Sequence, residues 1–151
     1  MISLRHCGIY VHDINKMELF YENVFQMHYI CRQEICCGEE FDILVGYDNT
    51  KILMSKLITE KGKVTGSGDM IELLQVIIPE QTNKSITKRL IEQGTIHIAM
   101  ECQFDKTLSL VKKYDGSVVI RPIVMKSGNK MCIVTDPEGN YIELIERMES
   151  L

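Results

Sequence analysis

The sequence predicts an α+β domain built from two related halves, and three observations support this. Each half opens with a histidine in a short apolar segment, at His6 and at His97. Each half also contains a glutamate between an isoleucine and a leucine, at Glu72 and at Glu143. An amphipathic segment and several runs of β-branched residues lie between these signatures. Two such halves packed together would form one core.

The first half reads as a strand, a helix and then further strands. Residues 4–11 form an apolar strand, and Asp13 is a suitable N-cap for a helix that ends near Phe25. The apolar face of this helix repeats at intervals of three and four residues, through Met17, Phe20, Tyr21 and Val24. The later strands are expected at residues 28–33, 41–47, 52–57 and 70–77. Residues 61–69 contain three glycines and are expected to form a loop.

A second helical pattern follows Pro79 and links the halves over residues 83–93. Asn83 is its expected cap and Gly94 its terminator. The expected buried stripe is Ile86, Leu90 and Ile91.

The second half repeats the order of the first. We expect a strand at 95–102, a helix capped by Asp105, and strands at 117–124, 131–135 and 141–146. The segment 136–140 contains a proline, a glycine and an asparagine, which is typical of a tight turn.

Composition narrows the function classes. A formal charge of -4 over 151 residues disfavours a nucleic-acid surface, which needs clustered basic residues. The chain has no apolar run of membrane-spanning length and no secretory signal pattern. Its six cysteines lack Cys-x-x-Cys spacing, which favours reduced and mostly buried thiols in a cytoplasmic protein.

Strand periodicity points to a metal site. His6 shares a strand face with Gly8, and His97 shares one with Ala99, so a small residue leaves space beside each imidazole. A single strand histidine is usually a packed core residue, and a single strand glutamate usually faces water. Four ligand-type residues in matching places of two matching halves favour a metal site instead.

These motifs resemble the vicinal-oxygen-chelate superfamily, which includes glyoxalase I, methylmalonyl-CoA epimerase, extradiol dioxygenases, and fosfomycin- and bleomycin-resistance proteins. The resemblance extends over residues 4–147 and includes the Asp136-Pro137-Glu138-Gly139 turn. It implies two βαβββ modules that form a U-shaped mixed sheet around a metal-binding cleft. We therefore expect one domain over 1–151, with module one at about 4–78, the linking helix at about 83–93 and module two at about 95–147.

The resemblance also implies a site. His6, Glu72, His97 and Glu143 would hold one divalent ion, which could be Ni, Zn, Co, Mn or Fe. The implied activity is that of a metal-dependent lyase or isomerase of glyoxalase I type, which transfers a proton next to a metal-bound carbonyl through an enediolate. Glu143 is the first choice for the base and Glu72 the second. Asp42 lies on an expected strand, near the place of the epimerase's acidic base.

The sequence leaves several alternatives open. Tyr10 stands where a glyoxalase has the arginine that anchors glutathione, which speaks against that thiol. A methylmalonyl-CoA epimerase-like racemase, a ring-cleaving dioxygenase and a non-catalytic binding or resistance protein share the fold. We expect a small-molecule substrate, a homodimer, and neither nucleic acid nor membrane as a partner.

Overall fold

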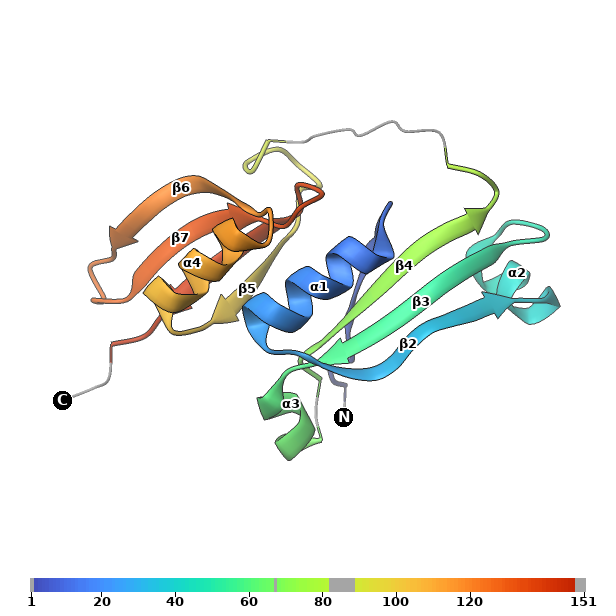
Figure 1. Cartoon of the computed structure of the whole chain (residues 1–151), viewed down its shortest axis with the longest axis horizontal. Coiled ribbons are helices and arrows are strands. Elements are labelled where there is room, and N and C mark those ends of the chain that lie inside the picture. The colour runs from blue at the N-terminus through green and yellow to red at the C-terminus, as the bar shows by residue number, and fades with distance from the viewer. Residues whose placement is uncertain (1, 67, 82–88, 149–151) are drawn as a thin grey trace. The chain divides into compact units, whose positions relative to one another are not determined.

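The computed structural model describes residues 2–66, 68–81 and 89–148. The chain forms two compact units (Figure 1). The first comprises Met1–Glu22 and Gln26–Lys84, and the second comprises Asn23–Phe25 and Ser85–Leu151. None of the described helices is long and apolar enough to cross a membrane.

Each unit contains a four-stranded mixed sheet of the same topology. The first sheet has the order β1-β4-β3-β2 and the second the order β5-β8-β7-β6. In both sheets the opening strand pairs in parallel with the closing strand, and the other pairs are antiparallel. The predicted α+β fold of two βαβββ-type modules is therefore confirmed.

The elements of the first unit follow the predicted order, with two additional helices. They are β1 (Cys7–Tyr10), α1 (Ile14–Phe25), β2 (His28–Cys37), α2 (Glu39–Val45), β3 (Lys51–Ile58), α3 (Glu60–Thr65) and β4 (Met70–Ile78). The opening strand is shorter than predicted, and Leu4 is exposed. Asp13 caps α1 as predicted, because its side chain accepts a hydrogen bond from the backbone N–H of Lys16 at 3.1 Å.

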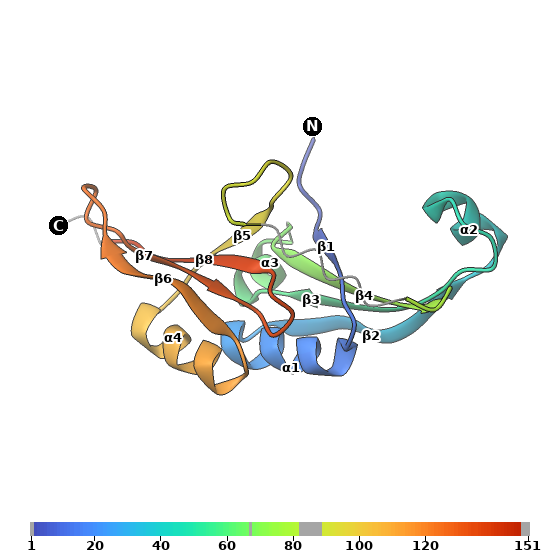
Figure 2. The same ribbon diagram turned by 90° about the horizontal axis from the view of Figure 1, so that it is seen from above.

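The prediction of a strand at residues 41–47 was wrong, because α2 occupies this segment. A short apolar run does not distinguish a strand from a helix by its pattern. Glu39, Glu40 and Asp42 place negative charge in the first turn, where the helix dipole favours it. Gly46 ends the helix with a φ of 76°. Figure 2 shows α2 on the side of the first sheet opposite α1.

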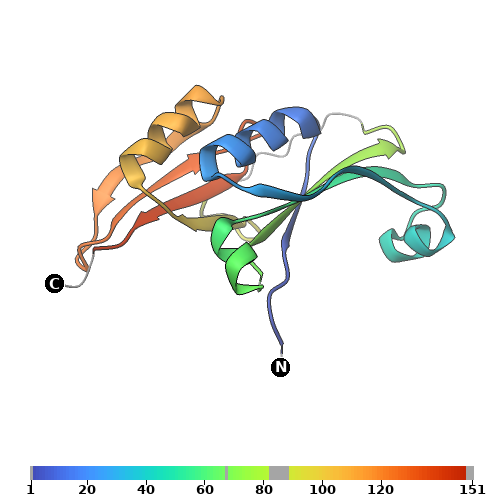
Figure 3. The ribbon, with the colours of Figure 1, turned by 60° about the horizontal axis from the view of Figure 1, so that its bottom comes forward.

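The expected loop at residues 61–69 contains the short helix α3. Thr59 caps it by accepting a hydrogen bond from the N–H of Gly62, and Gly66 ends it. Because α2 follows β2 and α3 follows β3, the two helices lie at opposite ends of the β2–β3 pair (Figure 3). Two of the glycines that indicated a loop belong to this helix or its cap. Gly62 packs closely within it, because a β-carbon there would lie 2.8 Å from the Ile58 side chain.

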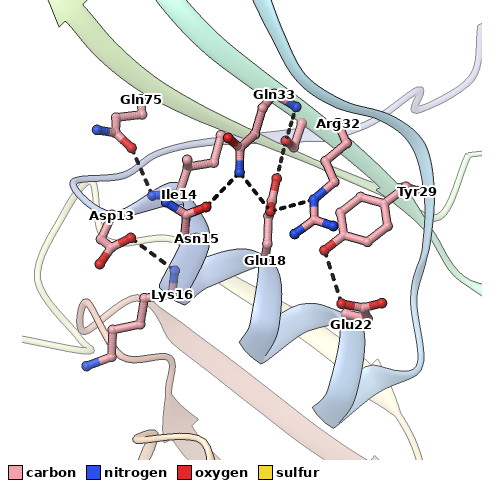
Figure 4. Close-up of polar contacts among 11 residues, drawn as sticks. Asp13, Ile14, Asn15, Lys16, Glu18, Glu22, Tyr29, Arg32, Gln33 and Gln75 are labelled. Atoms are coloured by element: carbon pink, nitrogen blue, oxygen red, sulfur yellow. Dashed lines mark hydrogen bonds and ion pairs between the residues drawn. The ribbon is translucent and has the colours of Figure 1, made fainter.

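A buried carboxylate joins α1 to the first sheet (Figure 4). The side chain of Glu18 is fully buried and accepts three hydrogen bonds. Its donors are Arg32 Nε at 3.0 Å, Gln33 Nε2 at 3.1 Å and Ser55 Oγ at 2.5 Å. The N–H of Gln33 donates in turn to Ser55 Oγ at 2.8 Å, at an irregularity in the β2–β3 register. This network fixes the helix over the sheet face that carries the buried residues of β3 and β4.

The second unit contains β5 (His97–Glu101), α4 (Phe104–Lys113), β6 (Ser117–Val124), β7 (Lys130–Thr135) and β8 (Tyr141–Glu146). The strands agree with the prediction. The helix cap does not: Gln103 is the N-cap residue, and Asp105 lies in the first turn with its carboxylate 2.7 Å from Lys130 Nζ. The turn at 136–140 is confirmed, and Gly139 adopts a φ of 90° there.

The linking helix falls partly outside the described residues, which omit 82–88 and with them Asn83 and Ile86. Its described end is a turn rather than a helix. The predicted burial of Ile91 was wrong, because this side chain is 94% exposed.

Candidate metal centre

One histidine–glutamate pair lies at the opening and closing strands of each sheet, with His6 one residue before β1 and His97 the first residue of β5. In the first sheet Gly8 of β1 lies opposite Glu72 of β4. In the second, Ala99 of β5 lies opposite Glu143 of β8. The histidine precedes the small residue by two positions in both sheets. The repeat seen in the sequence therefore corresponds to the same strand pairing in both sheets, in which the glutamate lies opposite the small residue.

The predicted orientation of the glutamates is also confirmed. The neighbours of Glu72 on β4, Ile71 and Leu73, are buried, and the same holds for both neighbours of Glu143 on β8. Because side chains alternate along a strand, each carboxylate lies on the face opposite the buried one. Both glutamate side chains remain partly accessible, at 16% for Glu72 and 22% for Glu143.

Imidazole and carboxylate lie close together within each unit. His6 Nε2 is 3.2 Å from Glu72 Oε2, and His97 Nε2 is 3.6 Å from Glu143 Oε2. Two ligands about 2.1 Å from one ion are about 3.0 Å apart at octahedral angles and about 3.4 Å apart at tetrahedral angles. The separation in the first pair, 3.2 Å, falls between these two distances, and the separation in the second pair, 3.6 Å, is slightly longer than both.

The surroundings of the first pair also fit an ion. A β-carbon on Gly8 would lie 3.8 Å from Glu72 Oε2, so a larger side chain there would cover the oxygen that faces His6. The Nδ1 atom of His6 is buried, and no described atom forms a hydrogen bond with it. The donor set of imidazole nitrogen and carboxylate oxygen suits first-row divalent metals.

Neither unit by itself, over its described residues, groups three or more His, Cys, Asp or Glu side chains that could hold an ion. The structure therefore provides two half-sites, one with His6 and Glu72 and one with His97 and Glu143. The convergence of all four residues on one ion stays a prediction.

Lys56 distinguishes the two half-sites, and sequence reasoning missed it. It lies directly opposite Glu72 on β3, and its Nζ is 3.0 Å from Glu72 Oε1. One oxygen of Glu72 thus faces a lysine and the other faces His6. The residue in the corresponding place opposite Glu143 is Ile133. A lysine in an apolar strand was visible in the sequence, but its partner depends on strand register.

Asp42 does not lie on a strand as predicted, because it belongs to α2. Its two carboxylate oxygens accept hydrogen bonds from the backbone N–H groups of Asn49 and Thr50, at 2.8 and 2.7 Å. This carboxylate holds the turn between α2 and β3. Its role as a base stays a prediction.

The thiols are less buried than predicted. All six cysteines are free, but only Cys132 is buried and Cys37 is exposed. Burial raises the pKa of the Cys132 thiol to about 11. Burial, followed by the Glu72 carboxylate, also raises the pKa of Cys36.

The fold places the chain in the class of proteins built from two βαβββ-type modules. A family model matches residues 3–144 and is described as the Glyoxalase/Bleomycin resistance protein/Dioxygenase superfamily. The chain belongs to this superfamily.

Solved structures show the same fold. A glyoxalase family protein from Bacillus cereus is 17% identical, with a TM-score of 0.87, and the match covers 99% of this chain and 96% of that one. The fosfomycin resistance protein FosX from Listeria monocytogenes, solved with Mn(II) and sulfate, is 20% identical, with a TM-score of 0.59 and coverage of 98% and 95%. TioX from Micromonospora is 14% identical, with a TM-score of 0.58 and coverage of 97% and 100%. A comparison with curated protein sequences yields no match.

Proposed function

We propose that the chain is a metal-dependent lyase or isomerase of glyoxalase type, which transfers a proton at the carbon next to a carbonyl. His6, Glu72, His97 and Glu143 would together hold one divalent ion. The observation that carries this proposal is that a glutamate faces a small residue of the opening strand in both sheets, and that a histidine precedes this small residue by two positions. A structural role for either pair alone would not require its repetition.

The donor set supports a divalent ion without selecting one, so Ni, Zn, Co, Mn and Fe are all candidates. The FosX structure contains Mn(II), and this supports including Mn in the first set of metals tested. When bound, such an ion supplies Lewis-acid polarisation of a substrate carbonyl.

The two glutamates would have different roles in the reaction. Lys56 restrains one oxygen of Glu72, which supports Glu72 as a fixed ligand. Glu143 has Ile133 as its cross-strand neighbour, and this leaves its carboxylate freer to move between ligand and base. We therefore assign Glu143 as the group that removes the proton, with Glu72 as the second choice.

Solvent deuterium exchange tests this assignment. Protein loaded with each metal in turn would be incubated in D₂O with two substrates: the hemithioacetal of methylglyoxal with glutathione, and methylmalonyl-CoA. We expect turnover with deuterium incorporation for at least one thioester or hemithioacetal. Glu143→Gln should lower the rate at least a hundredfold, by about the contribution of a general base. Full activity in protein stripped of metal would contradict the proposal.

A resistance protein is the second candidate, favoured by the similarity to FosX over 98% of this chain. In this case the protein would consume fosfomycin in the presence of Mn(II), with or without an added thiol. Phosphorus NMR of fosfomycin incubated with the Mn-loaded protein would show a new product signal. An unchanged spectrum would exclude this candidate.

We also propose that the protein is a homodimer. Light scattering on the eluting protein would give twice the 17.4 kDa chain mass. A mass of one chain at micromolar concentration would contradict this.

A further inference from the structure

A pocket of about 570 Å³ lies wholly within the first unit, at the end of the sheet where β1 and β4 finish. Its lining comes from β1 and β4 with the residues that follow each of them, from the start of β3, and from the end of α2 with the segment after it. The lining includes Tyr10, Val45, Tyr47, Ile52, Val76 and Glu80. The volume suits part of a small organic molecule.

The pocket continues the face that carries the half-site. Tyr10 follows Gly8 by two residues on β1, and Val76 follows Glu72 by four on β4, so both share a face with the half-site. At about 3.3 Å per residue, Val76 lies about 13 Å along the strand from Glu72. A molecule that reaches from the half-site along this face would enter the pocket.

The lining selects against negative charge. Among the described residues that form the pocket, none is lysine or arginine, Glu80 contributes a negative charge, and His12 is the one side chain able to carry a positive charge. An anionic group placed there would lose its hydration beside Glu80, with His12 as its one candidate ionic partner. Glutathione carries carboxylates and coenzyme A carries phosphates, so both are poor occupants of this pocket.

The lining favours a flat apolar body. Tyr10 and Tyr47 are both more than half exposed, so their rings are available to a ligand. Val45, Ile52 and Val76 add aliphatic surface. Aromatic side chains bind planar apolar groups by stacking and edge contacts.

We propose that this pocket binds an uncharged, largely apolar or aromatic portion of the substrate. The further step, that the carbonyl of the same molecule lies at the His6–Glu72 half-site, rests on the proposed function. The substrate would then be a carbonyl compound whose uncharged apolar portion lies in the pocket, with any charged carrier outside it.

Two fluorophores with the same aromatic body but different charge test the pocket without metal or turnover. N-phenylnaphthylamine is neutral, and anilinonaphthalene sulfonate carries one negative charge. We expect the neutral fluorophore to bind at least about tenfold more tightly. Tyr10→Ala and Tyr47→Ala should each weaken its binding by about threefold to tenfold. Tyr114→Ala, outside the pocket, is the matched aromatic control and should leave binding unchanged.

A variant that adds a positive charge to the pocket should strengthen binding of the anionic fluorophore instead of weakening it. Tyr10→Arg should strengthen binding of the sulfonate and reduce the preference for the neutral fluorophore. Equal or tighter binding of the sulfonate by the unmodified protein would overturn the proposal. Neutral binding that neither tyrosine variant changes would overturn it as well. Because these measurements need no bound ion, their failure would leave the metal site standing, and loss of the metal site would leave them unaffected.

Discussion

Lys56 and Glu72 face each other across β3 and β4, with the lysine Nζ 3.0 Å from Glu72 Oε1. The side chain of Glu72 is 16% exposed and that of Lys56 is 25% exposed, so the pair is only partly screened by water. The second oxygen of the carboxylate lies on the side of His6. A cross-strand ion pair thus orients a candidate metal ligand in one half of a repeated fold.

This relationship predicts a measurable coupling between the two residues in metal-free protein. A double-mutant cycle with Lys56→Met and Glu72→Gln should give a coupling free energy of about 1 kcal/mol in urea unfolding. The control cycle uses Arg147→Met and Glu101→Gln, since that pair is 71% and 55% exposed. Its coupling should stay below about 0.5 kcal/mol. Equal coupling in the two cycles would show that Lys56 does not restrain Glu72.

Glu18 is expected to dominate the stability of the contact between α1 and the first sheet. Glu18→Gln keeps the size of the side chain but replaces an accepting oxygen with a donating amide, in a place surrounded by three donors. Leaving such a buried donor unmatched should lower the free energy of unfolding by about 3 kcal/mol.

The matched variant is Glu22→Gln, one turn further along α1. Glu22 accepts a hydrogen bond from Tyr29 OH at 3.2 Å, and the contact is only partly buried. Glutamine keeps an accepting oxygen for Tyr29, so Glu22→Gln should lower the free energy of unfolding by less than about 1 kcal/mol in the same urea titration. Similar losses in the two variants would mean that the Glu18 network does not hold the helix.

Tyr29 should make stability fall at high pH. Burial, with the carboxylates of Glu18 and Glu22, raises the pKa of Tyr29 from 10.0 to about 12. Between these values the unfolded chain loses the phenol proton while the folded protein keeps it, so stability decreases as pH rises. The melting temperature of the unmodified protein should therefore fall relative to that of Tyr29→Phe between about pH 10 and about pH 12. Parallel curves over this range would contradict the raised pKa.

Sequence reasoning located the repeated elements because local pattern decides them. The period-two alternation around Glu72 and Glu143 fixed which face each carboxylate occupies, and Asp13 identified the start of α1. The prediction of a strand at residues 41–47 was wrong because an apolar run of this length fits a strand or a helix equally well. Lys56 was missed for a different reason: which residues face each other depends on register, and register depends on the whole sheet.

Metal content is the most direct test of the central claim. Protein purified without added metal or chelator would be analysed by elemental mass spectrometry, together with His6→Ala and His97→Ala. His28→Ala is the matched control, because His28 is an exposed histidine that pairs with Glu60 at 2.7 Å. We predict about one transition metal ion per chain, retained in the control and lost in both other variants. Absence of metal after incubation with Mn, Co, Ni and Zn, or metal retained in His97→Ala, would contradict a site shared by the two half-sites.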